Sequence, residues 1–413
     1  MNTTLADEEG AYLGSHRTVR AIREYQPDLV AIRHTLHRNP ELGFEEVFTA
    51  DLVAKELERY GVDEIHRGIG RTGVVGVVRG GNGGSKRSIG LRADMDALPM
   101  HEDNQFAHRS TRSGLMHGCG HDGHTTMLLG AARRLAETRE FDGTVHLIFQ
   151  PGEEGCGGAL AMIDDGLFDR FPCDAVFAMH NWPGLPPGRL AVRPGAVMAA
   201  ADKVTITVEG RGGHGAHAYL AVDPIVVAAQ IITAAQSIVS RNVQALDAAV
   251  VSLCAVNAGN PGAMSVIPQQ AQIVGTVRTF RPDTQDLIES RLTRLAESVA
   301  AGFDARATVA YERMYPATVN TASESLFAQD VARELVGDRL VTDLEPSMGA
   351  EDFAFMLQER PGAYFRLGQG GADSGCFLHN TRYDFNDTVM PLGVALFVRL
   401  AERWLAVDGP GGG

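Results

Sequence analysis

Histidine and cysteine residues gather in one short part of the sequence, where they could bind a metal ion. Five of the fourteen histidines fall within 24 residues, namely His101, His108, His117, His121 and His124. Glycines alternate with Cys119 and His121, and because glycine lets the backbone curl, the thiol and the imidazole can converge on one point. Both groups are ligands for first-row transition metals. The alternative is a glycine-rich turn in which Asp122 caps a helix and the histidines are solvated.

Further ligand-type residues follow three predicted strands at the point where each strand ends. They are Glu153 and Glu154 after strand 145–150, His180 after strand 175–179, and Asp94 and Asp96 after strand 88–92. Each group alone has an ordinary explanation, such as a solvated carboxylate pair, a core histidine or a turn residue. Because α/β sheets assemble their sites at the carboxyl ends of strands, the groups together favour one metal site.

The neighbouring glutamates indicate which chemistry such a site would carry out. Adjacent side chains on an extended chain point to opposite sides, so one glutamate can bind metal while the other faces the substrate. A metal ion lowers the pKa of bound water toward neutrality, and a nearby carboxylate can then accept the proton. This combination predicts a hydrolase.

The surrounding pattern predicts an α/β fold. Strands at 73–78, 88–92, 144–150 and 175–179 alternate with helices at 28–37, 45–60, 123–138 and 158–166. Such alternation is typical of a largely parallel sheet flanked by helices. The same texture resumes after residue 316, with helices at 323–336, 351–357 and 391–405.

Between these two stretches the pattern changes to β-α-β-β-α-β. The predicted strands are 203–208, 248–256, 271–279 and 308–315, and the predicted helices are 224–239 and 283–301. This order is typical of a ferredoxin-like α+β domain. We therefore predict a catalytic domain in two parts, 1–197 and 313–413, with a second domain inserted at 198–312.

The composition limits the kinds of binding partner and the cellular compartment that we expect for this protein. Lys+Arg 37 against Asp+Glu 51 give a formal net charge of −14, which disfavours binding to nucleic acid or anionic membranes. No run approaches the roughly 18 apolar residues that span a bilayer, and the first thirty residues have no apolar signal region. The cysteines are an odd, scattered set unlike a disulfide framework: Cys119, Cys156, Cys173, Cys254 and Cys376. We expect a soluble protein of the cytoplasm.

Eight motifs resemble the M20 metallopeptidase family, and within it the amidohydrolase branch of aminoacylase, hippurate hydrolase and auxin-conjugate hydrolase types. They are Leu91-Arg-Ala-Asp-Met-Asp-Ala-Leu-Pro99, Met116-His-Gly-Cys-Gly-His-Asp-Gly-His124, Phe149-Gln-Pro-Gly-Glu-Glu154, Gly212-Gly-His-Gly-Ala216, Val266-Ile-Pro268, Gly275-Thr-Val-Arg278, Gly349-Ala-Glu-Asp-Phe353 and Leu378-His-Asn380. The resemblance implies an α/β catalytic domain, an inserted ferredoxin-like lid domain and two divalent ions per subunit. Manganese or zinc is the first expectation for the ions, with nickel or cobalt as further candidates.

Position by position, the resemblance implies the following site. The metal ligands are Cys119, His121, Glu154, His180 and His379, and Glu153 is the general base. Asp94 matches an acidic residue that orients a metal-site group, with Asp96 as a close competitor. In the lid, His214 would stabilise the oxyanion, often from a partner subunit, and Arg278 would receive the substrate carboxylate.

The lid departs from the branch pattern at residues that line the substrate side of the cleft in relatives. The branch commonly has Pro-His where this chain has Ala218 and Tyr219, and it commonly has Asn where this chain has Ser265. Ser265 lacks the amide group, and Tyr219 offers an aromatic face or a phenol instead. The resemblance also implies a homodimer formed through the lid.

We therefore expect a metal-dependent amidohydrolase acting on a small N-acyl amino acid or a related aryl amide. The changed lid residues leave open an aminohydrolase that removes an amino group from an activated aromatic substrate. A third hypothesis is a protein that binds metal or a small ligand on the same fold without catalysis.

Overall fold

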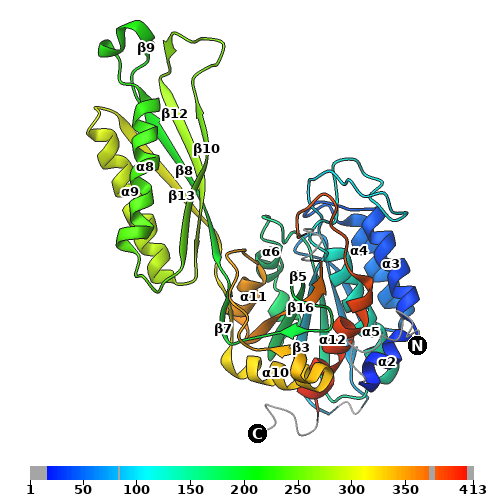
Figure 1. Cartoon of the computed structure of the whole chain (residues 1–413). Helices are drawn as coiled ribbons and strands as arrows, with labels where there is room; N and C mark the ends of the chain where they lie inside the picture. Colours follow the sequence, from blue (N-terminus) through cyan, green and yellow to red (C-terminus); the bar gives the residue numbers. More distant parts are fainter. Residues whose placement is uncertain (1–15, 82–83, 372–376, 407–413) are drawn as a thin grey trace, which may run out of the picture. The chain divides into compact units, whose positions relative to one another are not determined.

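The structure, a computed structural model, describes residues 16–81, 84–371 and 377–406, which form two compact units. Unit 1 takes its described residues from Met1–Val197, Val319–Glu345 and Asp352–Gly413, and unit 2 comprises Met198–Thr318 and Pro346–Glu351 (Figure 1). The chain thus leaves unit 1 and returns to it. The domain limits 1–197, 198–312 and 313–413 stay a prediction.

Unit 1 is built on a mixed sheet of eight strands in the order β1-β2-β4-β3-β5-β16-β6-β15. Their bounds are β1 Glu64–Ile69, β2 Gly73–Arg79, β3 Ser88–Asp94, β4 Thr144–Gln150, β5 Ala175–Pro183, β6 Leu190–Ala191, β15 Leu340–Val341 and β16 Gly362–Gly370. The four central strands β4, β3, β5 and β16 run parallel, while β1, β2 and β6 run antiparallel to a neighbour. Because parallel strands end at the same edge of a sheet, their carboxyl ends bring several loops together.

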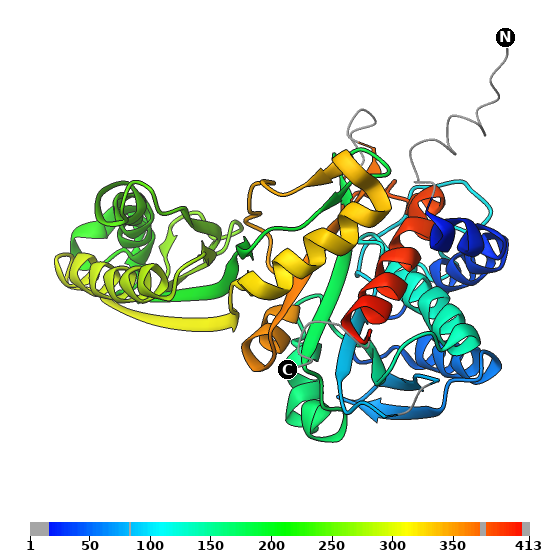
Figure 2. The same cartoon turned by 90° about the horizontal axis from the view of Figure 1, so that it is seen from below.

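Helices flank both faces of this sheet (Figures 1 and 2). One layer contains α2 Arg17–Arg23, α3 Gln26–Arg38, α4 Val47–Arg59, α5 His121–Thr138, α10 Ala322–Val336 and α12 Met390–Trp404. On the other face α6 Gly158–Asp164 and α11 Phe353–Glu359 contact each other and the strands β4 and β5, and α7 Leu167–Arg170 follows α6. A Cβ on Gly130 of α5 would lie 2.8 Å from Val394 of α12, so these two helices pack closely. The predicted α/β class is confirmed.

Two elements near the candidate ligands differ from the predicted bounds. Helix α5 begins at His121, two residues before the predicted start, because Gly120 adopts a left-handed φ of 94° that turns the chain into the helix. Strand β5 continues to Pro183, and Arg366 of β16 pairs with His180. His180 therefore lies inside a strand and not after its end.

Unit 2 is a four-stranded antiparallel sheet in the order β10-β12-β8-β13. In chain order its elements are β8 Ala200–Glu209, α8 Pro224–Asn242, β10 Ala249–Ala258, β12 Gln270–Thr279, α9 Pro282–Ala301 and β13 Arg306–Tyr315. An apolar core that includes Ile206, Ile231 and Ile288 lies between the helices and the sheet. The predicted β-α-β-β-α-β order is thereby found. Short strands also pair, β9 Gly213–His214 with β11 Val266–Ile267 and β7 Gly195–Met198 with β14 Thr318–Asn320.

Helix α8 is the one helix of the described residues that is long and apolar enough to cross a membrane. One such helix is weak evidence for a membrane span, because core helices pass the same test. Val227, Ile231 and Ile238 of α8 are buried in the core of unit 2. Ile225 and Val226, in contrast, are 44% and 47% exposed.

The packing of α12 can be tested with one matched pair of substitutions. Leu396 of α12 is 0% exposed, whereas Leu326 of α10 is 59% exposed. Leu396→Ala should lower the free energy of unfolding by about 2–5 kcal/mol, because it leaves a cavity in the core. Leu326→Ala should change it by less than about 0.5 kcal/mol. Denaturant unfolding followed by circular dichroism measures both, and equal losses would contradict the assigned packing.

Candidate metal centre

Cys119 lies in a tight loop that only glycine neighbours permit. Gly120 has a φ of 94°, and a Cβ there would lie 2.5 Å from Oδ1 of Asn181 and 2.6 Å from the hydroxyl oxygen of Tyr383. A Cβ on Gly118 would lie 2.7 Å from the sulfur of Met100. The loop can therefore come close to β5 and to the 377–386 loop, and it leaves the Cys119 thiol buried between them.

The five predicted ligands form two groups that share Cys119. The first group is Cys119, His121 and His180, and the second is Cys119, Glu154 and His379. Within each group the ligand atoms all lie within 4.8 Å of one another. The Cys119 sulfur is 3.3 Å from Nε2 of His180, and Nε2 of His379 is 3.2 Å from Oε1 of Glu154.

The hydrogen bonds to the two histidines of the first group use Nδ1 of each ring, so Nε2 faces the other candidate ligands. Nδ1 of His180 donates to the carbonyl oxygen of Asn181 at 2.7 Å, and Nδ1 of His121 lies 3.2 Å from Oδ1 of Asp96. Both histidines can thus present Nε2 to an ion. Nε2 of His121 is buried and has no hydrogen-bond partner among the described residues, and the contact of the buried Oε1 of Glu154 is with Nε2 of His379, a second candidate ligand. Sulfur, imidazole and carboxylate donors fit a divalent transition metal.

The two candidate orienting carboxylates contact different histidines. Asp96 meets Nδ1 of His121, whereas Asp94 lies 3.8 Å from Nε2 of the same ring. Asp94 instead bonds Nδ1 of His124 at 2.6 Å and receives a hydrogen bond from Arg92 at 2.9 Å. Burial alone would raise the pKa of Asp94, but His121, His124 and Arg92 hold it well below its usual value. The geometry therefore favours Asp96 for orienting His121, and the predicted role of Asp94 stays a prediction.

His124 belongs to the histidine-rich motif but not to either ligand group. Its ring lies between Asp94 and Asn181, with Nε2 2.6 Å from Oδ1 of Asn181. Both ring nitrogens are therefore already bonded. Through Asp94 and Asn181, His124 links β3 to β5 next to the candidate ligands.

Glu153 is buried beside the ligand groups. It forms a third group of neighbouring ligand-type atoms with His121 and Glu154. Its Oε1 accepts a hydrogen bond from the backbone N–H of Asp352 at 3.4 Å. The carboxylate is thus held next to the ligands, within the chain segment that carries one of them.

Glu46, which the sequence analysis missed, holds the loop that carries Glu153. Its Oε1 accepts a hydrogen bond from the N–H of Gly152 at 2.8 Å, and its Oε2 accepts one from Thr72 at 2.5 Å. Burial raises the pKa of Glu46 to about 7. No signal in the sequence marks this residue, because it directly precedes a helix in which exposed glutamates are common.

The predicted lid residues lie in two separate parts of unit 2. His214, Tyr219 and Ser265 are close together, since Gly215 N–H donates to the Ser265 carbonyl at 2.7 Å and Tyr219 is a neighbour along the chain. Arg278 lies near the opposite end of β12, where it pairs with Ala201. The eight residue-to-residue steps from Gln270 to Arg278 span about 27 Å in an extended strand. Unit 2 therefore does not bring Arg278 next to His214.

Comparison with known proteins decides the family. The sequence profile described as Peptidase family M20/M25/M40 matches residues 90–403. The chain belongs to this family. Hippurate hydrolase of Campylobacter jejuni is 43% identical over 385 residues, 93% of this chain and 98% of the relative. IAA-amino acid hydrolase ILR1-like 2 of Arabidopsis thaliana is 38% identical over 383 residues, 91% of this chain and 85% of the relative.

Solved structures of the M20 family share the fold. The Bacillus subtilis YXEP protein, described as a dinuclear metal binding peptidase, has a TM-score of 0.80 and 33% identity, covering 93% of this chain and 99% of its own. A putative aminohydrolase from methicillin resistant Staphylococcus aureus has a TM-score of 0.85 and 29% identity, covering 94% and 98%. Membership of M20 and the two ligand groups together support binding of divalent metal ions.

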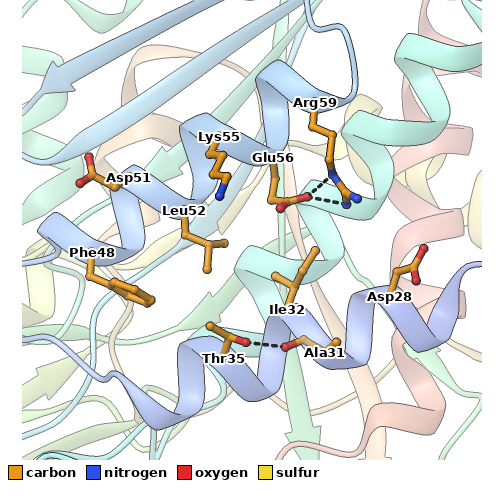
Figure 3. A pocket seen from close by; sticks show the side chains of 10 residues that line it. All are labelled: Asp28, Ala31, Ile32, Thr35, Phe48, Asp51, Leu52, Lys55, Glu56 and Arg59. Carbon is orange, nitrogen blue, oxygen red and sulfur yellow. Dashed lines mark hydrogen bonds and ion pairs between the residues drawn. The ribbon is translucent and has the colours of Figure 1, made fainter.

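A hollow on the surface of this M20 protein is separate from the ligand groups. It lies between α3 and α4 and is lined by Asp28, Ala31, Ile32, Thr35, Phe48, Asp51, Leu52, Lys55, Glu56 and Arg59 (Figure 3). Glu56 and Arg59 pair with each other across one turn of α4. None of the ten residues is a candidate ligand, so the hollow adds nothing to the metal centre.

The shared sulfur can be tested by counting ions. Cys119→Ala should lower the affinity for both proposed ions, whereas His379→Ala should lower mainly the affinity for one of them. Loss of a residue that merely orients a ligand costs about 10- to 100-fold in affinity, so loss of a ligand should cost at least as much. Metal content after equilibration with increasing concentrations of a chelator measures the dissociation constant of each ion. The exposed Cys254 in unit 2 gives the control Cys254→Ala, which should bind both ions normally.

Proposed function

We propose that this protein is a metal-dependent amidohydrolase that cleaves the amide bond of a small N-acyl amino acid or a related aryl amide. The observation that carries the proposal is the pair of ligand groups sharing Cys119, with the buried Glu153 beside them. Relatives named for hydrolysing hippurate, amino acid conjugates and N-acetylcysteine support the substrate class. We assign Cys119, His121, Glu154, His180 and His379 as ligands.

Glu153 is the proposed general base and proton carrier. When bound, the divalent ions would supply Lewis acidity that polarises the amide carbonyl and lowers the pKa of water. Glu153 accepts the proton of the attacking water and passes it to the leaving nitrogen. The Asp352 N–H steadies one carboxylate oxygen during both transfers. Sulfur and imidazole donors suit zinc, and manganese is the second candidate, with nickel or cobalt after them.

Substrate recognition is proposed to come from unit 2. Arg278 is half-buried, and this burial lowers its pKa, yet a guanidinium remains charged and can bind a carboxylate through two parallel hydrogen bonds. We assign Arg278 to the substrate carboxylate, His214 to the oxyanion, and Tyr219 and Ser265 to the variable part of the substrate. Tyr219 is 80% exposed, so its ring is available for contact.

We also propose a homodimer formed through unit 2. The chain enters this unit beside Ala200, which pairs with Thr279, whereas His214 lies beyond the other end of the same strands. Arg278 and His214 are therefore too far apart within one copy to contact one small substrate. A second copy would supply His214. The outer face of α8, with Ile225 and Val226 exposed and no charged residue between Asp223 and Arg241, supports a contact between copies.

Two further assignments complete the proposal. The described cysteines, Cys119, Cys156, Cys173 and Cys254, are all free thiols, which supports a cytoplasmic location; Cys376 lies outside the described residues. The structural neighbour described as a putative aminohydrolase supports testing arylamines beside the amides. Release of an amino group from a ring, with every amide left intact, would favour that second reaction.

Glu153→Gln tests the general base. It should lower kcat on an N-acyl amino acid by about 100-fold or more, because the amide cannot accept the proton, while both ions remain bound. Chelation should abolish wild-type activity, and Mn²⁺ or Zn²⁺ should restore it. Glu58→Gln, on the exposed surface of α4, is the control and should be fully active. Turnover near the wild-type rate in metal-replete Glu153→Gln would show that another group is the base.

Mixing two inactive subunits tests the dimer. If His214 acts on the partner's site, dimers that combine Glu153→Gln with His214→Ala contain one complete site. A randomly mixed population should then recover about a quarter of wild-type activity, since half of its dimers are mixed and each has one of two sites. Activity that stays at the level of the separate variants would place His214 in its own subunit's site or outside catalysis.

A further inference from the structure

A buried cluster of charges surrounds Arg33 on α3, and the proposed chemistry does not use it. The side chain of Arg33 is 0% exposed although it carries a permanent charge. Nη1 donates to Oδ2 of Asp122 at 3.2 Å and to Oδ1 of Asp384 at 2.9 Å. Nη2 donates to Oδ2 of Asp387 at 3.0 Å. One guanidinium therefore joins three carboxylates.

These carboxylates belong to the two segments that carry candidate ligands from different groups. Asp122 follows His121 in the first turn of α5. Asp384 and Asp387 follow His379 by five and eight residues; Asp384 lies in the loop 377–386, which contains neither helix nor strand, and Asp387 directly follows it. Arg33 thus ties the loop of His379 to the helix that begins with His121.

The cluster depends on the shape of the guanidinium as well as on its charge. Burial opposes the charge of Arg33, but Asp122, Asp384 and Asp387 outweigh it and hold its pKa above the usual value. Oδ2 of Asp122 also accepts a hydrogen bond from Nδ1 of His37 at 2.8 Å. A lysine ammonium is a single point of charge and cannot meet three separated carboxylates with the geometry of the planar fork.

The loop needs such support because His379 has an unfavourable backbone. Its φ is +62°, in the left-handed region that residues other than glycine rarely adopt. Its N–H donates to the carbonyl oxygen of Gly118 at 2.8 Å, and the Asp103 N–H donates to the Thr381 carbonyl at 2.8 Å. These bonds fix the first part of the loop, and Arg33 fixes its far end.

We propose that Arg33 is a positioning residue that places His379, and so sets the affinity of the ion that His379 binds, without touching an ion itself. The proposal rests on the proposed function, because it takes Cys119, Glu154 and His379 as one ion site. It requires that the two ions respond differently to a change at Arg33. Binding of the ion held by Cys119, His121 and His180 should change little, because His121 lies in helix α5 and its Nδ1 contacts Asp96 at 3.2 Å without involving Arg33.

Metal affinities of the full chain test this difference. Zn²⁺ is titrated against a competing chelator into wild type, Arg33→Lys, His379→Ala and the double variant. Arg33→Lys should lower the affinity for one ion by about 10- to 100-fold, which is the range for residues that orient a ligand. The affinity for the other ion should stay within about threefold of the wild-type value. The weakened ion should be the one that His379→Ala weakens. In the double variant, Arg33→Lys should cause almost no further loss of affinity for that ion beyond the loss from His379→Ala, because the residue that Arg33 positions is already gone.

A gentler variant and a matched control keep the test decisive even if Arg33→Lys folds poorly. Asp387→Asn keeps the side-chain volume and should weaken the same ion. Asp103→Asn makes the same change at a side chain that is 55% exposed and outside the cluster, and it keeps the backbone N–H that bonds the Thr381 carbonyl, so binding of both ions should be unchanged. In metal-free protein, Arg33→Lys should also speed amide hydrogen exchange in residues 377–387.

Three results would overturn the proposal. They are an equal loss of affinity for both ions in Arg33→Lys, losses of affinity from Arg33→Lys and His379→Ala that add in full in the double variant, or unchanged affinity for both ions in Asp387→Asn. Each of them presupposes two ions in the wild type and leaves the amidohydrolase proposal standing. Failure of the wild type to bind a second ion would instead reject the two-ion site itself, and with it the role of Arg33.

Discussion

The sulfur of Cys119 has to lie within reach of four other candidate ligand atoms, from the start of α5, strand β5, the loop after β4 and the 377–386 loop. A side chain with a single donor atom can belong to two groups only if its backbone approaches both closely, and Gly118 and Gly120 make that approach sterically feasible. If each group held one divalent ion, Cys119 would serve as a ligand in both sites. The parallel arrangement of β4, β3, β5 and β16 serves the same requirement, because it directs the loops to a common edge.

Near this sulfur, buried charged residues are joined in a chain of ion pairs and hydrogen bonds. Arg92 lies between Asp94 and Asp352, with Nη atoms 2.9 Å and 3.2 Å from their carboxylates. Asp352 in turn donates its N–H to Glu153. An unpaired buried charge is strongly destabilising, so each of these residues constrains the next one. The consequence is a rigid support, in which the ligand-bearing loops are held from behind by ion pairs and not only by apolar packing.

Sequence patterns predict the fold class, the inserted unit and four of the five proposed ligands for identifiable reasons. Hydrophobic runs indicate the strands, and polar residues at their ends indicate Glu153, Glu154 and His180. His379 follows no such pattern, because it lies in an irregular loop, and only the family resemblance points to it. The choice between Asp94 and Asp96 depends on how the chain leaves β3, which two equally spaced acidic residues do not disclose. Arg33 and Glu46 escape notice because charged residues in or beside helices usually face solvent.

The position of β16 in the sheet has a consequence for how the protein is made. This strand lies between β5 and β6, yet its residues, Gly362–Gly370, are translated after all of unit 2. In a growing chain, β5 therefore lacks its β16 neighbour until residues 362–370 emerge from the ribosome. Exposed strand edges invite pairing with other chains, so this edge of β5 is a site of mispairing until β16 is made.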